Sequence, residues 1–311
     1  MNTTVLVTGG CGYIGSALVP ILDANEHTER IVVMDDHSTG SPRALMGSLS
    51  ETIDFVRGDV REYGDVENAM RGCDTVIHLA AITGAASTHE HPEETFETNL
   101  DGTENVLTAA GKLGIENVVL ASSCNLYGRA TSMDLDETID PDPINPYAET
   151  KLEAERLLDR TSEEFGFNGT ALRLATNYGH APGIRFNLVV NQFVFRALTD
   201  RALTVYGDGS NWRPFIHVTD SARAYAHAAV YPDSWEQLVY NVGSESENYR
   251  ISEIASIVSD EVAAVDVTYL EDEHPGPSYH VSFDRLTETD FETEWTLRDG
   301  VRDLAQRFKT E

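Results

Sequence analysis

The sequence is short of lysine and cysteine, and it contains no long apolar run. Only Lys112, Lys151 and Lys309 occur in 311 residues. The three cysteines have neither the spacing of a metal site nor that of a disulfide framework. No apolar stretch approaches the about 20 residues of a membrane span, and the first residues lead into an apolar run without an evident signal peptide. We therefore expect a cytoplasmic protein that holds no metal and enters no membrane.

Acidic residues dominate the charge of the chain. There are 52 aspartates and glutamates against 22 lysines and arginines, which gives a net charge of −30. Such a surface disfavours nucleic acids and anionic membranes as partners. Self-repulsion of the surface largely vanishes at about 1 M salt, where the Debye length is about 3 Å. We expect a salt-adapted protein from a halophile; the alternative is an ordinary acidic cytosolic enzyme.

A glycine-rich turn follows the first apolar run. Residues 8–15 read Thr-Gly-Gly-Cys-Gly-Tyr-Ile-Gly and come directly after the apolar residues 4–7. Glycines at positions 9, 12 and 15 allow a tight turn, close approach of the backbone to phosphates, and close packing of a helix on a strand. The first gap is one residue longer than in the usual dinucleotide fingerprint. The turn predicts a pyrophosphate at the amino end of the following helix.

An aspartate at the end of the second apolar run indicates which dinucleotide binds. The run 31–34 ends in Asp35, twenty residues after Gly15. A carboxylate there can accept hydrogen bonds from both ribose hydroxyls of NAD, and it would repel the extra phosphate of NADP. The alternative is a glycine-rich turn with an unrelated surface aspartate. We favour NAD as the cofactor.

Strand-like and helix-like patterns alternate up to about residue 178. This alternation predicts an α/β fold, a Rossmann-type doubly wound parallel sheet, in which ligands bind at the carboxyl ends of the strands. We expect an NAD-binding domain over residues 1–178 and a smaller α/β substrate lobe over 179–311, interwoven with the first. The expected strands are 4–7, 31–34, 53–57, 75–79, 117–121 and 170–174. The expected helices are 13–25, 62–71, 93–113, 146–165, 188–199, 219–230, 251–258 and 300–308.

A serine, a tyrosine and a lysine form the expected catalytic set. Tyr147 and Lys151 are four residues apart, so on a helix beginning at Pro146 they share one face. A phenol with an ordinary pKa near 10 is a poor base, but the Lys151 ammonium and the positive nicotinamide ring would lower that pKa. Ser123 follows the fifth expected strand and can steer a substrate hydroxyl toward Tyr147. Turn chemistry at the strand end is the alternative role for this serine.

Together these motifs resemble the extended short-chain dehydrogenases/reductases, in particular the sugar-nucleotide epimerase/dehydratase group and its UDP-glucose 4-epimerase-type members. The resemblance covers nearly the whole chain. The matching segments are residues 8–15, Asp35, residues 58–60, residues 78–81, Asn99 with residues 102–103, Ser123, Tyr147 with Lys151, and residues 206–218.

The resemblance implies a role for each matching position. The aspartates would hold the adenosine ribose and flank the adenine, and Arg213 would reach the phosphates of a nucleotide sugar with its rigid donor fork. His78 is expected to be a hydrogen-bonded core histidine instead of a catalyst. The residues expected at NAD are Gly9, Gly12, Tyr13, Ile14, Gly15, Asp35, Asp36, Asp59, Val60, Leu79, Ala80, Ala81, Asn99, Tyr147 and Lys151. The residues expected at the substrate are Ser123, Asn125, Thr176, Asn177, Arg185, Asn187 and Arg213.

Three segments depart from the pattern of the resembled group. His274 replaces the arginine that relatives often carry in a late Arg-Pro-Gly-Asp segment, which leaves a second phosphate contact open. Many relatives carry an asparagine three residues after the arginine of the sixth strand, and Thr176 takes that place here. Residues 185–191 also differ from the common epimerase version and resemble a side branch of unassigned substrates. These departures leave the sugar and its nucleotide open.

The expected reaction is a 4-epimerisation with retained NAD, of the UDP-glucose/UDP-galactose type, through a transient 4-keto sugar. A 4,6-dehydratase or decarboxylase of the same fold is one alternative, although Cys124 and Asn125 stand where dehydratases usually carry an acidic pair. A dehydrogenase or reductase that releases its cofactor is a second alternative, and a non-catalytic NAD sensor is a third. A homodimer is expected, paired through helices 93–113 and 146–165.

Overall fold

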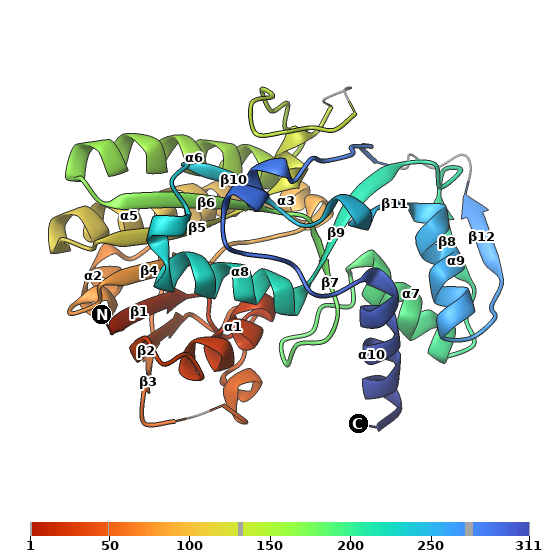
Figure 1. The fold of residues 1–311 in the computed structure, drawn as a ribbon, viewed down its shortest axis with the longest axis horizontal. Helices are drawn as coiled ribbons and strands as arrows, with labels where there is room; N and C mark the ends of the chain where they lie inside the picture. Colours follow the sequence, from red (N-terminus) through yellow and green to blue (C-terminus); the bar gives the residue numbers. More distant parts are fainter. Residues whose placement is uncertain (1, 49, 130–132, 271–275, 311) are drawn as a thin grey trace.

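The computed structural model describes residues 2–48, 50–129, 133–270 and 276–310 (Figure 1). A seven-stranded sheet, all of whose pairings are parallel, forms its larger part. In spatial order the strands are β10 (Val239–Val242), β6 (Asn168–Leu174), β5 (Asn117–Ser123), β4 (Thr75–His78), β1 (Thr3–Thr8), β2 (Thr28–Asp35) and β3 (Ile53–Arg57). Within the described ranges, no helix is both long and apolar enough to cross a membrane.

Helices cover both faces of this sheet, which confirms the predicted doubly wound α/β fold. One face carries α2 (Tyr63–Met70), α5 (Gly102–Leu113) and α6 (Pro146–Phe165), and the other carries α1 (Tyr13–Asp23) and α8 (Val218–Val230) (Figure 1). Because the inner strands β1, β2, β4 and β5 are covered on both sides, they contain continuous apolar runs. Val33 packs toward α1 and α8, whereas its neighbour Val32 packs toward α2 and α5.

The predicted helix 93–113 is interrupted. It consists of α4 (Pro92–Phe96), a π-helical turn η2 (Glu97–Asp101) and α5, and a short helix α3 (Ala85–Glu90) precedes it. The π turn carries the buried Asn99. Such turns are frequent at functional sites because they redirect one side chain without ending the helix.

The remaining elements form a smaller lobe with its own core. Strands β7 (Thr176–Tyr178), β9 (Trp212–His217) and β11 (Asn248–Arg250) form one sheet, and β8 (Leu203–Tyr206) pairs with β12 (Val267–Leu270). Helices α7 (Val189–Leu198), α9 (Ile251–Glu261) and α10 (Leu297–Thr310) pack on them. Strand β10 and helix α8, which come later in the chain, belong to the large sheet. The chain therefore crosses between the two parts more than once, and a domain boundary at residue 178 stays a prediction. The short helices are η1 (Pro42–Leu45), η3 (Cys124–Tyr127), η4 (Pro232–Ser234), η5 (Glu245–Glu247) and η6 (Asp284–Glu288).

The apolar residues of α5 and α6 divide between core and surface. Val106, Leu107 and Leu158 are fully buried in the cluster beneath the sheet face, so they cannot form a dimer contact. Phe96 and Leu100 are half-buried. Fewer apolar residues of these two helices are therefore available for the expected dimer contact than the sequence indicates, and the homodimer stays a prediction.

Candidate functional site

The glycine turn connects β1 to α1 at the carboxyl edge of the sheet. Gly9 has φ +69°, and a Cβ there would lie 2.7 Å from the Ala80 nitrogen. A Cβ on Gly15 would lie 2.5 Å from Gly10 Cα. Both positions therefore require glycine. Gly12 caps α1 without a side-chain hydrogen bond, so main-chain N–H groups at the helix start can bind an anion.

The side chains of Tyr13 and Ile14 are engaged within the protein. The Tyr13 ring is buried, and its hydroxyl donates to the Gly179 carbonyl at 2.7 Å. Ile14 packs against the core of the large sheet. At a pyrophosphate we therefore expect the amide groups of these two residues and not their side chains.

Asp35 is buried at the end of β2 and holds the glycine turn. Its Oδ2 accepts from the Cys11 amide at 3.0 Å, and its Oδ1 accepts from the His37 amide at 2.9 Å. Each carboxylate oxygen can accept a further bond, so the residue fits an adenosine ribose. With the required glycines, this arrangement fits NAD.

Cys11, Asp35 and His37 bring three potential metal-ligand atoms within 4.8 Å of one another. The sequence spacing does not indicate this grouping. Burial, reinforced by Asp35, raises the pKa of the Cys11 thiol to about 12. Because metals bind the thiolate, this burial opposes coordination, and the group lies where the ribose is expected.

Asp36, expected at the adenosine ribose, and Asp59 and Val60, expected at the adenine, are engaged with the protein. Asp36 accepts from the amide and hydroxyl of Ser38 at 2.9 and 2.7 Å. Asp59 pairs with Arg61 at 2.6 Å, and this hydrogen-bonded guanidinium lowers the pKa of Asp59. The side chain of Val60 is buried against Gly102, so only its main chain is placed for an adenine.

Asn99 fixes the loop that follows β4. Its Oδ1 accepts from the Ile82 amide at 2.7 Å, and its Nδ2 donates to the Ile82 carbonyl at 2.9 Å and to Thr150 Oγ1 at 3.1 Å. Residues 79–81, expected along the path to the nicotinamide, lie just before Ile82. The buried amide thus ties this loop to α6.

His78 is the core histidine that the sequence predicts. Its Nδ1 is hydrogen-bonded to Thr8 Oγ1 at 2.7 Å and its Nε2 to Thr103 Oγ1 at 3.0 Å. Burial lowers the pKa of His78 to about 3. The imidazole is therefore neutral and structural, which confirms the prediction.

The structure brings Ser123, Tyr147 and Lys151 together. Ser123 ends β5, and a side-chain hydrogen bond joins it to Tyr147 on the first turn of α6. Asn145 caps this helix by accepting from the Ala148 amide at 2.9 Å. Lys151 is 3% exposed, and its Nζ lies 5.9 Å from the centroid of the Tyr147 ring.

The pKa of Tyr147 is shifted upward, whereas the sequence predicts a lowered value. Burial raises the pKa of Tyr147, and the opposing groups are the Ser123 hydrogen bond and the Arg185 guanidinium. Burial also lowers the pKa of Lys151 to about 8, against the charge of Glu155. Burial therefore outweighs the groups that lower the Tyr147 pKa, and the effect of Lys151 on this pKa stays a prediction.

A buried ion pair behind the set escaped the sequence reasoning. Arg173 Nε and Nη2 donate to Glu155 at 2.9 and 2.7 Å, and Ser122 also donates to this carboxylate. Glu155 lies one helical turn after Lys151. A comparison of charges four residues apart along α6 would have indicated Glu155 as a neighbour of Lys151. It would not have indicated Arg173, which lies on β6.

A second tyrosine in the site also escaped the sequence reasoning. Tyr279 is 4% exposed, and its side chain is hydrogen-bonded to those of Asn125 and Thr176. The Arg213 guanidinium lies 4.6 Å from the centroid of its ring. Three of the expected substrate residues thus surround Tyr279, which lies in a segment without periodic pattern.

Asn177 lies on the other side of its strand, which corrects its expected role. Its Oδ1 accepts from Ser221 of α8 at 2.7 Å. Successive side chains of a strand point to opposite faces, so Thr176 and Asn177 cannot both face Tyr279. The Asn177 side chain therefore packs toward α8, away from the residues expected at the substrate.

The segment between β7 and α7 crosses the sheet edge. The Gly183 amide donates to Ser16 on α1 at 3.0 Å, and Arg185 Nη1 donates to Thr83 beyond β4 at 2.6 Å. Arg185 Nε also donates to Asn187 at 3.3 Å. The segment therefore spans the point between β1 and β4 where the winding of the sheet reverses, which is where doubly wound folds bind ligands.

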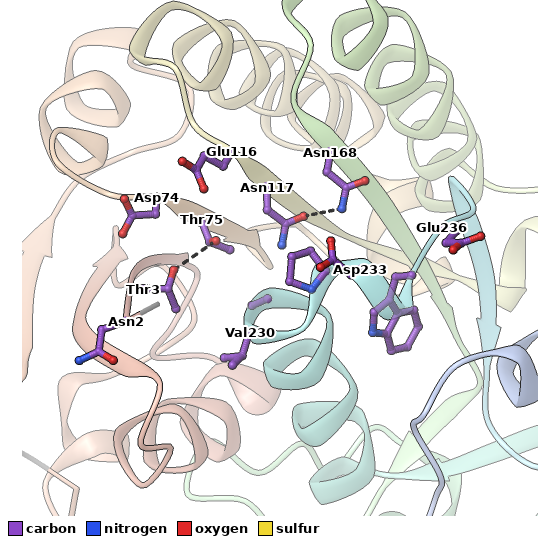
Figure 2. Close-up of a pocket in the computed structure, with 13 residues that line it drawn as sticks. Asn2, Thr3, Asp74, Thr75, Glu116, Asn117, Asn168, Val230, Asp233 and Glu236 are labelled. Carbon is purple, nitrogen blue, oxygen red and sulfur yellow. Dashed lines mark hydrogen bonds between the residues drawn. The ribbon is translucent and has the colours of Figure 1, made fainter.

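A cavity of about 730 Å³ lies at the opposite edge of the sheet (Figure 2). The first residues of four parallel strands line this cavity: Thr3, Thr75, Asn117 and Asn168. The Ser123, Tyr147 and Lys151 set lies at the carboxyl ends. This cavity therefore does not belong to the site.

Comparisons with known proteins agree with this geometry. The NAD dependent epimerase/dehydratase family matches residues 5–243. The chain is 26% identical over 310 residues to a putative UDP-glucose 4-epimerase of Methanocaldococcus jannaschii, with 98% of each chain covered. It is 32% identical over 240 residues to a UDP-glucose 4-epimerase of Halalkalibacterium halodurans, covering 71% of this chain and 69% of the relative. The structure of the Thermus thermophilus UDP-glucose 4-epimerase complex with NAD gives a TM-score of 0.83 at 29% identity, covering 98% of this chain and 99% of that one.

Proposed function

The chain belongs to the NAD-dependent epimerase/dehydratase family, and from this premise we propose that it is a nucleotide-sugar 4-epimerase. The observation that carries the proposal is the hydrogen-bonded Ser123 and Tyr147 beside the buried Lys151 at the carboxyl edge of the sheet. The set can exchange a proton with a sugar hydroxyl, which is what oxidation and reduction at one carbon require.

Each residue of the set has a distinct task. Tyr147 accepts the proton of the C4 hydroxyl and returns it to the same oxygen, after the 4-keto sugar has turned over so that the hydride returns to the other face of C4. Ser123 holds that hydroxyl toward Tyr147, and the Lys151 ammonium stabilises the phenolate. NAD, when bound, supplies the acceptor and donor of the C4 hydride. The loop that Asn99 holds and the turn at Gly9 would position the NAD.

The residues after Ser123 favour epimerisation over dehydration. A 4,6-dehydratase needs an acid and a base beside its serine or threonine. Here Cys124 is 1% exposed, donates to the Arg173 carbonyl at 3.2 Å, and has a pKa raised by burial. Asn125 is an amide. Neither side chain supplies a carboxylate for elimination at C5 and C6.

Arg213 is the residue proposed for the diphosphate of the substrate. Its guanidinium lies over the Tyr279 ring and donates to the Trp212 carbonyl at 2.9 Å. Its planar donor fork matches phosphate oxygens. UDP-glucose and UDP-galactose are the first pair to test.

The test is product analysis in high salt with nucleotide sugars, by mass spectrometry and NMR. Epimerisation conserves mass, dehydration removes one water, and a dehydrogenase releases NADH. Tyr147→Phe should keep bound NAD and lose turnover by about 100-fold or more. Tyr231→Phe, an exposed tyrosine on another element, is the control and should keep full activity. Normal turnover of the Tyr147 variant would contradict the proposal.

A further inference from the structure

Tyr225 is a fully buried tyrosine on α8, and its hydroxyl has no hydrogen-bond partner among the residues that the structure describes. The side chain is 0% exposed and belongs to the core cluster between the large sheet and helices α1 and α8. Buried donors in proteins are nearly always satisfied, either by protein atoms or by ordered water. This phenol therefore requires an explanation that packing alone does not give.

The direction of α8 turns this side chain toward the carboxyl edge of the sheet. The Asn117 side chain, at the start of β5, donates to the Ala228 carbonyl at 3.0 Å, so the carboxyl end of α8 lies at the amino edge. Ser221, one turn before Tyr225, donates to Asn177 just beyond the end of β6 at 2.7 Å. Side chains of a helix lean toward its amino end. The Tyr225 phenol therefore leans toward the edge that carries the reacting set.

Strand alternation places Ser123 on the face of the sheet that α8 covers. Val119 and Ala121 of β5 pack in or against the cluster that contains Tyr225. Because every second side chain of a strand points to the same face, Ser123 lies on that face as well. Ser123 is hydrogen-bonded to Tyr147. The Ser123 and Tyr147 pair thus lies at the end of the sheet toward which the Tyr225 phenol leans.

Tyr225 and Tyr147 interact electrostatically, and they titrate differently. Burial raises the pKa of Tyr225 well above that of an ordinary phenol, and a charged Tyr147 raises it further. Tyr225 therefore stays protonated while Tyr147 gains and loses its proton. A neutral phenol can donate a hydrogen bond to a phenolate and does not compete with it as a base.

We propose that Tyr225 is a positioning residue for Tyr147: its hydroxyl donates to an ordered water, and this water donates to the Tyr147 phenolate from the α8 side. The inference rests on the proposed function, in which the phenolate is the base. A bridging water is nearly as favourable in enthalpy as a direct hydrogen bond. The bridge favours the charged form of Tyr147. It transfers no proton, because the substrate proton moves only between Tyr147 and the C4 oxygen.

The experiment measures kcat and KM across pH in high salt for wild type and Tyr225→Phe, with the complete protein and a nucleotide sugar that wild type epimerises. Loss of the donor disfavours the phenolate. The acid limb of the kcat profile should therefore move to higher pH by about one unit, the value of one hydrogen bond to a charged group, with KM nearly unchanged. The other titratable or charged groups that act on Tyr147 stay in place, namely Lys151 on α6, Cys124 on η3, Arg185 before α7 and Tyr279 before η6.

Tyr178→Phe is the matched control. Tyr178 is also 0% exposed, and no described residue hydrogen-bonds its hydroxyl, but it lies in the core of the small lobe. This variant should leave the acid limb in place. An unmoved limb in Tyr225→Phe overturns the inference alone, and so does an equal shift in the control. Loss of bound NAD by Tyr225→Phe would assign the hydroxyl to the cofactor and would also overturn it. Absence of any epimerisation by wild type overturns the proposed function and this inference together.

Discussion

Replacing Glu155 with glutamine tests two effects of this carboxylate: its contribution to the free energy of unfolding and its effect on the pKa of Lys151. The carboxylate is 4% exposed and accepts two hydrogen bonds from Arg173, at 2.9 and 2.7 Å. Glu155→Gln leaves the buried Arg173 charge uncompensated. The expected loss in the free energy of unfolding is about 3–5 kcal/mol.

The same variant should change the pH dependence of activity. Burial lowers the pKa of Lys151 to about 8, and the Glu155 charge works in the opposite direction. Without that charge the pKa falls below about 8, so Lys151 loses its proton at lower pH. The alkaline limb of the kcat profile should therefore move to lower pH.

A double variant distinguishes the two effects. Glu155→Gln with Arg173→Met removes both charges, so most of the lost stability should return. The alkaline limb should stay displaced, because the Glu155 charge is still missing. Glu153→Gln is the control: this glutamate lies on the same helix and pairs at the surface with Arg156 at 2.6 Å. It should cost less than about 1 kcal/mol.

The assays are urea unfolding at fixed high salt and kcat measured across pH. Equal stability of the Glu155 and Glu153 variants would refute the buried ion pair as a stabilising unit. An alkaline limb that does not move in either Glu155 variant would refute the electrostatic link to Lys151.

Three further predictions concern the cofactor, the stability and the assembly. Gly9→Ala should lose bound NAD on gel filtration and cost about 1–3 kcal/mol, because φ is +69° and the Cβ meets Ala80; Gly72→Ala, at φ +77° with open space around its Cβ, should retain NAD, and equal retention by both would contradict the reasoning. Burial raises the pKa of Glu247 from 4.5 to about 7. The protonated form is thus favoured on folding, and stability present below pH 4.5 is lost as pH rises through 7, by about 3 kcal/mol. Glu247→Gln should remove this slope from unfolding curves, and an unchanged slope would exclude Glu247 as its source. Light scattering in high salt should give twice the 34.2 kDa chain mass, and a monomer mass would rule out the homodimer.

The sequence predicts the large sheet well because its strands are locally marked. Strands β1, β2, β4 and β5 contain continuous apolar runs, and the apolar residues of β3 and β6 also lie between turns and helical patterns. The seventh, β10, has four residues and returns to the sheet after a long excursion through the small lobe. Its place depends on contacts with β6 that no local pattern reveals.

The site is predictable where chemistry follows chain spacing. Tyr147 and Lys151 share a helix, and Ser123 ends a strand, so their proximity follows from topology. Tyr279 does not, because only tertiary packing brings it to Asn125. The orientation of Asn177 depends on the face of a three-residue strand, and the Tyr147 pKa depends on burial. Salt adaptation stays a prediction, since neither the fold nor the comparisons test it.

The fate of the C4 hydrogen tests the epimerase proposal most directly. A nucleotide sugar deuterated at C4 should yield the C4 epimer with its deuterium retained and its mass unchanged, because the same hydride is removed and returned within one site. Loss of deuterium with release of reduced cofactor, or a product lighter by one water, would contradict the account.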